Sequence, residues 1–138
     1  MTSEKSEISR RTAFFVTIAA AATMFGSSSR AASIKFRTLT SFQLAEMLKK
    51  KDFLFINVHT PYEGEIKNTD AFIPFDKIAD DLDKLPKEKT AKIVLYCRSG
   101  RMSEIAARKL AQLGFNQVFH LSGGMIDWQK SGYKILER

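Results

Sequence analysis

Cys97, the single cysteine of the chain, stands in a stretch whose residue types favour a reactive thiolate. It follows the apolar run 93–96 and precedes the polar segment 98–101, which reads Arg-Ser-Gly-Arg. A short loop containing glycine can turn several backbone N–H groups inward as an anion-binding nest. A helix that starts directly afterwards adds its positive end, and two arginines add permanent charge. These features lower the pKa of a cysteine, so we expect a nucleophile that ionises near neutral pH.

The alternative is an inert cysteine that ends a strand inside the core, which is the usual fate of a lone cysteine. The Arg-Ser-Gly-Arg segment argues against this, because an inert core residue gains nothing from cationic and polar neighbours. The reactive interpretation makes two structural demands on Cys97. The sulfur must be accessible to solvent, and the amides of the loop must face it.

Apolar runs and helical spacings alternate along the rest of the chain. We expect short strands at 34–36, 53–58, 71–75, 92–96 and 117–121, and helices at about 41–50, 76–85, 102–113 and 124–131. This alternation predicts an α/β domain with a mainly parallel sheet and helices on both faces. Ligands of such sheets bind beyond the carboxyl ends of the strands, and Cys97 is expected at that edge.

Local signals support two of the helices. Thr40 and Gln43 have the spacing of a capping box, which predicts a helix start at residue 41. Phe42, Ala45 and Leu48 are then expected on its buried face. Ile78, Leu82 and Leu85 are spaced for one face of the helix at 76–85.

The N-terminal segment has the pattern of an export signal. Paired arginines precede an uncharged apolar run at 13–25, and small residues follow it up to Ala31. The run is shorter than the roughly 20 residues that span a bilayer. We therefore expect a signal peptide at 1–31, of twin-arginine or general secretory type, and one domain at 32–138 that is periplasmic or extracellular. The alternative is a membrane anchor formed by an uncleaved signal.

The formal net charge of +7 is spread along the chain. Lys49, Lys50 and Lys51 form one basic run, but they fall at the expected end of a helix, where cations are favourable. No nucleic-acid motif accompanies them, so no nucleic-acid partner is expected. The two histidines, His59 and His120, lie at no metal-site spacing from each other or from Cys97. His120 alternates with apolar residues on an expected strand and is interpreted as a structural histidine with a satisfied hydrogen bond.

The runs IVLYCRSGRMS, AARKLAQLGF and VFHLSGGMIDWQKSGY closely resemble the single-domain rhodanese sulfurtransferases, over about residues 39–133. The resemblance implies the rhodanese-like α/β fold and a catalytic Cys97. Its thiolate would take sulfur from an anionic donor such as thiosulfate, become a persulfide, and pass the sulfur to cyanide or a thiol. It implies neither a metal nor an organic cofactor. The residues expected to bind the substrate sulfur form the loop: Arg98, Ser99, Gly100, Arg101, Met102 and Ser103.

Several roles stay open within this resemblance. Arg98 and Arg101 either orient the anionic donor or serve as solvated charges, and Ser103 either donates to the sulfur or caps the helix. The family usually has Asp-Val-Arg where this chain has Asn57-Val58-His59, which weakens an expected ion pair and removes a positive charge. One alternative function is a sulfur carrier that acts without turnover on a dedicated protein partner. Another is an interaction domain without catalysis.

Overall fold

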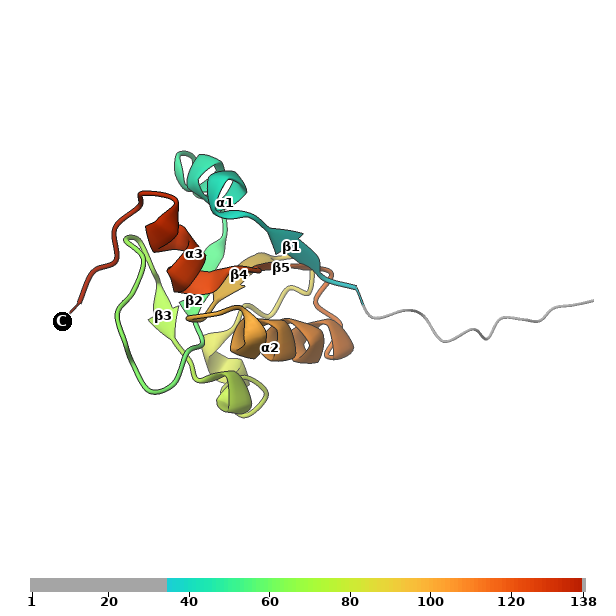
Figure 1. Ribbon diagram of the computed structural model, residues 1–138. Coiled ribbons are helices and arrows are strands. Elements are labelled where there is room, and N and C mark those ends of the chain that lie inside the picture. Colours follow the sequence, from blue (N-terminus) through green and yellow to red (C-terminus); the bar gives the residue numbers. More distant parts are fainter. Residues whose placement is uncertain (1–34, 138) are drawn as a thin grey trace, which may run out of the picture. The chain divides into compact units, whose positions relative to one another are not determined.

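A computed structural model describes residues 35–137, and its centre is a sheet of five parallel strands in the order β1-β5-β4-β2-β3 (Figure 1). Because every neighbouring pair is parallel, the carboxyl ends of the strands lie along one edge. This confirms the predicted α/β class with a parallel sheet. The strands are β1 (Arg37–Leu39), β2 (Leu54–Asn57), β3 (Ala71–Phe72), β4 (Lys92–Tyr96) and β5 (Gln117–Leu121).

Helices cover both faces of the sheet. Figure 1 shows α1 and α3 on one side of the strands and α2 on the other. Two 3₁₀ turns lie on the α2 side. The helical elements are α1 (Ser41–Leu48), α2 (Arg101–Gln112), α3 (Gly124–Lys130) and the 3₁₀ turns Phe75–Lys77 and Leu82–Lys84.

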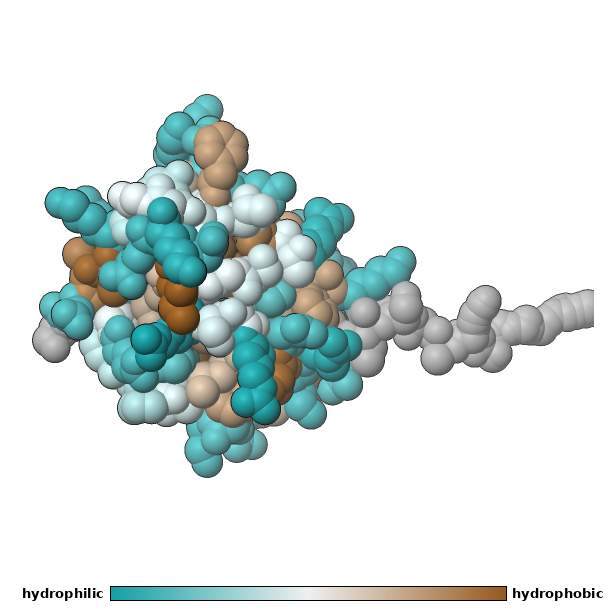
Figure 2. Space-filling view, in the orientation of Figure 1, coloured by the Kyte–Doolittle hydropathy of each residue, from teal (hydrophilic) through white to brown (hydrophobic). Residues whose placement is uncertain are grey.

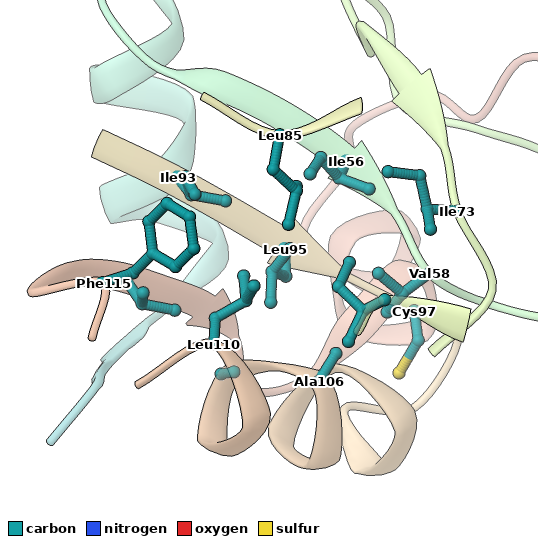
Figure 3. Packing of buried hydrophobic residues seen from close by; sticks show 13 residues of the cluster. Ile56, Val58, Ile73, Leu85, Ile93, Leu95, Cys97, Ala106, Leu110 and Phe115 are labelled. Atoms are coloured by element: carbon teal, nitrogen blue, oxygen red, sulfur yellow. The ribbon is translucent and has the colours of Figure 1, made fainter. Parts of the chain in front are cut away.

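The core divides into two clusters because side chains alternate along the central strand β4. Ile93 and Leu95 pack with the α2 side chains, including Leu110. Val94 and Tyr96 pack in the cluster that contains Trp128 of α3, as well as residues of α1. Figure 3 shows the first cluster, in which Cys97 lies beside Val58. The cysteine therefore belongs to the packed interior on the α2 side.

Several elements match their predicted positions. The strands β4 and β5 have the predicted bounds, and α2 runs from Arg101 to Gln112 within one residue of the predicted helix. The capping box of α1 is confirmed: the Gln43 N–H donates to Thr40 Oγ1 at 3.1 Å, and the Thr40 N–H donates to Gln43 Oε1 at 2.9 Å. Local hydrogen-bonding signals of this kind act independently of the rest of the fold.

The prediction of one helix at 76–85 was wrong. The segment forms two separate 3₁₀ turns, with Asp81 outside the helical region of φ and ψ. Ile78 and Leu85 are buried as expected, but Leu82 is 47% exposed. Aspartate side chains compete with helical hydrogen bonding, and the three aspartates at 80, 81 and 83 lie where the helix would have needed its middle turn.

Two further sequence predictions need correction. The first strand lies at Arg37–Leu39 and not at 34–36. The backbone of Arg37–Leu39 pairs with Phe119 to Leu121 of β5. Two of its three residues are exposed, so it lacks the apolar run that marks a buried strand. On α1 the buried residues are Ser41 and Leu44, whereas Phe42 is 66% exposed.

The predicted signal peptide at 1–31 lies outside the described residues. None of the helices at 35–137 is long and apolar enough to cross a membrane. Figure 2 shows hydrophilic residues spread over the visible face of the molecule, with small hydrophobic areas between them.

Candidate functional site

Cys97 follows β4 directly, and the loop after it curls so that one of its amides points at the sulfur. The Gly100 N–H donates to Cys97 Sγ, with 2.9 Å between nitrogen and sulfur. Gly100 has a φ of +102° and is the N-cap of α2, a conformation that L side chains rarely adopt. A Cβ at this position would also overlap the carbonyl oxygen of Ser122. Glycine is therefore required for this amide to reach the sulfur.

The start of α3 fixes the loop from the other side. The N–H groups of Met125 and Ile126 donate to the carbonyl oxygens of Cys97 and Arg98, at 2.9 and 3.0 Å. Gly124 has a φ of +64°, and a Cβ there would overlap the Arg98 carbonyl. The Gly-Gly turn predicted at 123–124 thus lets α3 approach the cysteine loop closely. The loop carbonyls bond to α3, so their negative ends are directed toward α3 and not toward the sulfur.

Of the two structural demands on a reactive Cys97, the structure meets one in part and does not meet the other. An amide faces the sulfur, but the residue is only 1% exposed. The expectation of an accessible thiol was wrong, because Cys97 packs into the apolar cluster beneath α2 (Figure 3). A sulfur donor can reach Sγ only when the loop or the side chains around it move.

Two buried polar side chains lie on the inner side of the cysteine. Ser103 Oγ is 3.6 Å from Cys97 Sγ and 2.9 Å from His120 Nδ1, and it is also 3.1 Å from the Gly100 carbonyl oxygen. Ser103 and His120 are both buried. Burial lowers the pKa of His120, which favours the neutral imidazole. His120 is hydrogen-bonded as predicted. Of the two roles left open for Ser103, the helix cap falls to Gly100, and the Ser103 hydroxyl lies within hydrogen-bonding distance of the sulfur.

The arginines of the loop have different surroundings. Arg98 Nη1 lies 3.2 Å from Glu63 Oε1, and the other oxygen of Glu63 lies 3.0 Å from His59 Nε2. The hydrogen bond from His59 is the main cause of a lowered pKa for Glu63. Arg101 is exposed and forms no ion pair with any residue at 35–137. Among the described residues it is therefore the loop arginine whose charge has no ion-pair partner.

A cavity of about 200 Å³ lies beside the loop and is open to solvent. Its walls combine the charges of Glu63, Arg98 and Glu137 with apolar side chains of α3, including Ile126. Cys97 is not among the residues that line it. The described residues contain no group of three His, Cys, Asp or Glu side chains that could bind a metal ion.

Asn57 and His59, which depart from the usual family residues, are joined by a hydrogen bond. The Asn57 amide donates to the Gly64 carbonyl at 3.0 Å, and its oxygen accepts from the His59 N–H at 3.0 Å. Both residues are buried. Asn57 thus satisfies buried backbone groups without the carboxylate that the family usually has, and His59 makes the local contact with Glu63 described above.

Sequence reasoning missed the contact between Ser103 and His120. Strand alternation places Val118 and His120 on the same face of β5, and Val118 packs in the cluster under α2. That pattern was available in the sequence and would have placed His120 under α2. The distance to Ser103 depends on how α2 sits on the sheet, which the pattern does not specify.

The fold and the cysteine loop agree with a family match. The model of the rhodanese-like domain matches residues 41–131, so the chain belongs to the rhodanese-like domain family. Solved structures of similar fold include a rhodanese-related protein from Thermoplasma volcanium, 27% identical with a TM-score of 0.62, which covers 72% of this chain and 97% of that one. Another is a rhodanese-like domain protein from Staphylococcus aureus, 27% identical with a TM-score of 0.61, covering 73% and 99%.

Curated relatives carry a different activity in their names. The tRNA uridine(34) hydroxylase of Hamiltonella defensa is 34% identical over 103 residues, which is 70% of this chain and 29% of that protein. The enzyme of the same name from Escherichia coli is 33% identical over 98 residues, covering 67% and 28%. The chain therefore spans less than a third of the length of these relatives.

Proposed function

We propose that the chain is a sulfurtransferase that carries sulfane sulfur on Cys97. In the first step the thiolate attacks the outer sulfur of thiosulfate, a new S–S bond forms, and sulfite leaves with the electron pair of the old one. In the second step cyanide or a thiolate attacks the outer sulfur of the persulfide, and the Cys97 thiolate leaves. The proposal rests above all on the Gly100 amide directed at Sγ, because this donor stabilises an anionic sulfur.

The burial of Cys97 adds a requirement to this mechanism. Cys97 as a residue is 1% exposed, so we infer that the site opens before the donor reaches the sulfur. Arg101, whose charge is exposed and unpaired within the described residues, is suited to attract an anionic donor to the loop. Arg98 is already paired with Glu63 and contributes less free charge.

The proposal is tested by turnover. We expect the full chain to convert thiosulfate and cyanide to sulfite and thiocyanate over many cycles, and Cys97→Ala to abolish this. Arg101→Ala should raise KM for thiosulfate while leaving most of kcat. Arg108→Ala, which removes an exposed arginine of α2, is the matched control. Loading of one sulfur without turnover would instead favour a carrier that delivers sulfur to a protein partner. If the protein shows no loading and no turnover, both the enzyme and the carrier proposals are contradicted.

A second candidate function comes from the curated relatives. Their names describe hydroxylation of a tRNA uridine, and their identity to this chain is 33–34%. The chain covers only 28–29% of those proteins. Nucleoside mass analysis of tRNA incubated with the chain would detect a hydroxylated uridine. Its appearance, lost in Cys97→Ala, would replace sulfur transfer as the proposed activity.

The proposed location is outside the cytoplasm, after removal of residues 1–31. The support is the twin arginines and apolar run of the N-terminal segment. In that compartment the partners would be a small anionic sulfur donor and a thiol or cyanide acceptor, or a relay protein, and the mature chain would have no membrane span.

A further inference from the structure

The buried contact between Ser103 and His120 adjoins the sulfur and has no part in the mechanism described so far. The side chains come from three elements: Cys97 after β4, Ser103 in the first turn of α2, and His120 in β5. They form a continuous array, with 3.6 Å from Sγ to Ser103 Oγ and 2.9 Å from Oγ to His120 Nδ1. All three are buried, so water does not compete for these hydrogen bonds.

The Ser103 hydroxyl has a single hydrogen, and three neighbours compete for it. If His120 Nδ1 carries no proton, Ser103 donates to Nδ1 and presents only lone pairs to the sulfur. That arrangement suits a neutral thiol, whose S–H donates to Oγ. If Nδ1 carries the proton, His120 donates to Ser103. The hydroxyl hydrogen then has two acceptors, the Gly100 carbonyl oxygen at 3.1 Å and Sγ at 3.6 Å. A thiolate draws it toward Sγ, because a charged acceptor forms the stronger hydrogen bond. The position of the imidazole proton therefore decides which form of Cys97 the array stabilises.

The surroundings of His120 favour a proton on Nδ1. Among the described residues, Ser103 is the hydrogen-bond partner of the imidazole, and it bonds to Nδ1. The Phe36 ring packs against the His120 ring, with 5.4 Å between the ring centroids. The Arg108 guanidinium lies over the Phe36 ring, 5.3 Å from its centroid. A buried N–H at Nε2 would lack an acceptor among these groups, which is costly.

We propose that His120 is a positioning residue for Cys97, holding its proton on Nδ1 so that the Ser103 hydroxyl donates to the thiolate. The sulfur anion then accepts from two groups, the Gly100 N–H and the Ser103 O–H. Ionisation of the thiol releases its proton to solvent, and the imidazole keeps its hydrogen count. This inference rests on the proposed function, in which the thiolate is the attacking form.

Other charged groups surround the array and stay unchanged in the test below. Glu104 of α2 acts on His120 and favours its charged form, against the larger effect of burial. The others belong to the loop, to α2 and to the segment after β2: Arg98, Arg101, Arg108 and the pair His59–Glu63.

The single cysteine allows a direct titration. Thiolate absorbance near 240 nm, measured on the full chain between about pH 4 and 9 and corrected with Cys97→Ala, reports Cys97 alone and needs no access to the sulfur. The midpoint of wild type is compared with the midpoints of the variants. Ser103→Ala and His120→Phe should each raise the midpoint by about one pH unit, since each removes the hydroxyl's bond to a charged sulfur.

Two comparisons separate positioning from a structural role. His120→Asn keeps an N–H near Nδ1 and should restore the wild-type midpoint. In the Ser103→Ala background, His120→Phe should add nothing, because its effect passes through the hydroxyl. An unchanged midpoint in His120→Phe, no rescue by asparagine, or an undiminished effect without Ser103 would each overturn the proposal.

A third readout uses wild-type protein, so it remains informative if a variant fails to fold. Imidazole ¹⁵N NMR distinguishes the two tautomers, and His59→Gln assigns the signals of the two histidines. The proton is expected on Nδ1 of His120, and an Nε2–H tautomer would contradict the inference. None of these measurements contains a sulfur donor. If the titration midpoint depends on His120 but the protein does not take up sulfur, the proposed function is refuted and the positioning role of His120 stands.

Discussion

Tyr96, the residue before Cys97, closes a ring of hydrogen bonds inside the core. The Ile66 N–H donates to Tyr96 Oη at 2.9 Å, Tyr96 Oη and Thr69 Oγ1 are 2.7 Å apart, and Thr69 donates to the Ile66 carbonyl at 2.6 Å. Since the Thr69 hydrogen is used on Ile66, Tyr96 must donate to Thr69. Burial is the main cause that raises the pKa of Tyr96 to about 12, so the hydroxyl stays neutral.

Tyr96→Phe should therefore lower the free energy of unfolding by about 1–3 kcal/mol, because the buried Ile66 N–H loses its acceptor. Urea unfolding measures this. Tyr133→Phe is the control: that ring stacks on Trp128, and its loss of a hydroxyl should cost less than about 0.5 kcal/mol. Equal effects of the two substitutions would contradict the hydrogen-bonded ring.

At this scale the sequence predicted the loop around Cys97 better than the burial of the residue. The residue types at 98–101 indicated an anion-stabilising loop, and the Gly100 amide does face the sulfur. The burial of Cys97 could not be predicted, because it depends on how Val58 and the α2 side chains pack around the end of β4. Those contacts join segments far apart in sequence.

At the scale of elements, the junction from β4 to α2 depends on Gly100. Its φ of +102° is strained for any residue with a Cβ, and its Cβ position is occupied by the Ser122 carbonyl after β5. Gly132, after α3, has a similar φ of +96° but no atom within 4 Å of its Cβ position. The two glycines thus share the backbone requirement and differ in packing.

Gly132→Ala should cost about 1–2 kcal/mol of stability, from backbone strain alone. Gly100→Ala should cost at least about 2 kcal/mol more, because the loop or the Ser122 segment must shift to relieve the overlap. Thermal or urea unfolding of both variants provides the comparison. Similar losses would show that the loop and β5 are not packed as described.

Elements with strong local signals could be predicted from the sequence, and weakly marked ones could not. The capping box located α1, and the apolar spacing of Ala106 and Leu110 located α2. The segment 76–85 has helical spacing of its apolar residues, yet the aspartates at its centre break it into two 3₁₀ turns. β1 is mostly exposed, and its position is set by pairing with β5.

For the whole molecule, the alternation of strands and helices was enough to predict the layered architecture. A parallel sheet needs crossover helices, and these must cover both faces. The architecture brings the end of β4, the start of α2 and the start of α3 together at one edge, which is where Cys97 lies. The sequence predicted this edge because the carboxyl ends of parallel strands are the usual ligand sites.

The central claim is that Cys97 accepts a sulfur atom despite its burial, and intact-mass spectrometry tests it most directly. The full chain is treated with thiosulfate, desalted and compared with Cys97→Ala treated in the same way. Wild type should gain the mass of one sulfur atom, cyanide should remove it, and the alanine variant should gain nothing. An unmodified wild type, or equal gain by both proteins, would contradict the account.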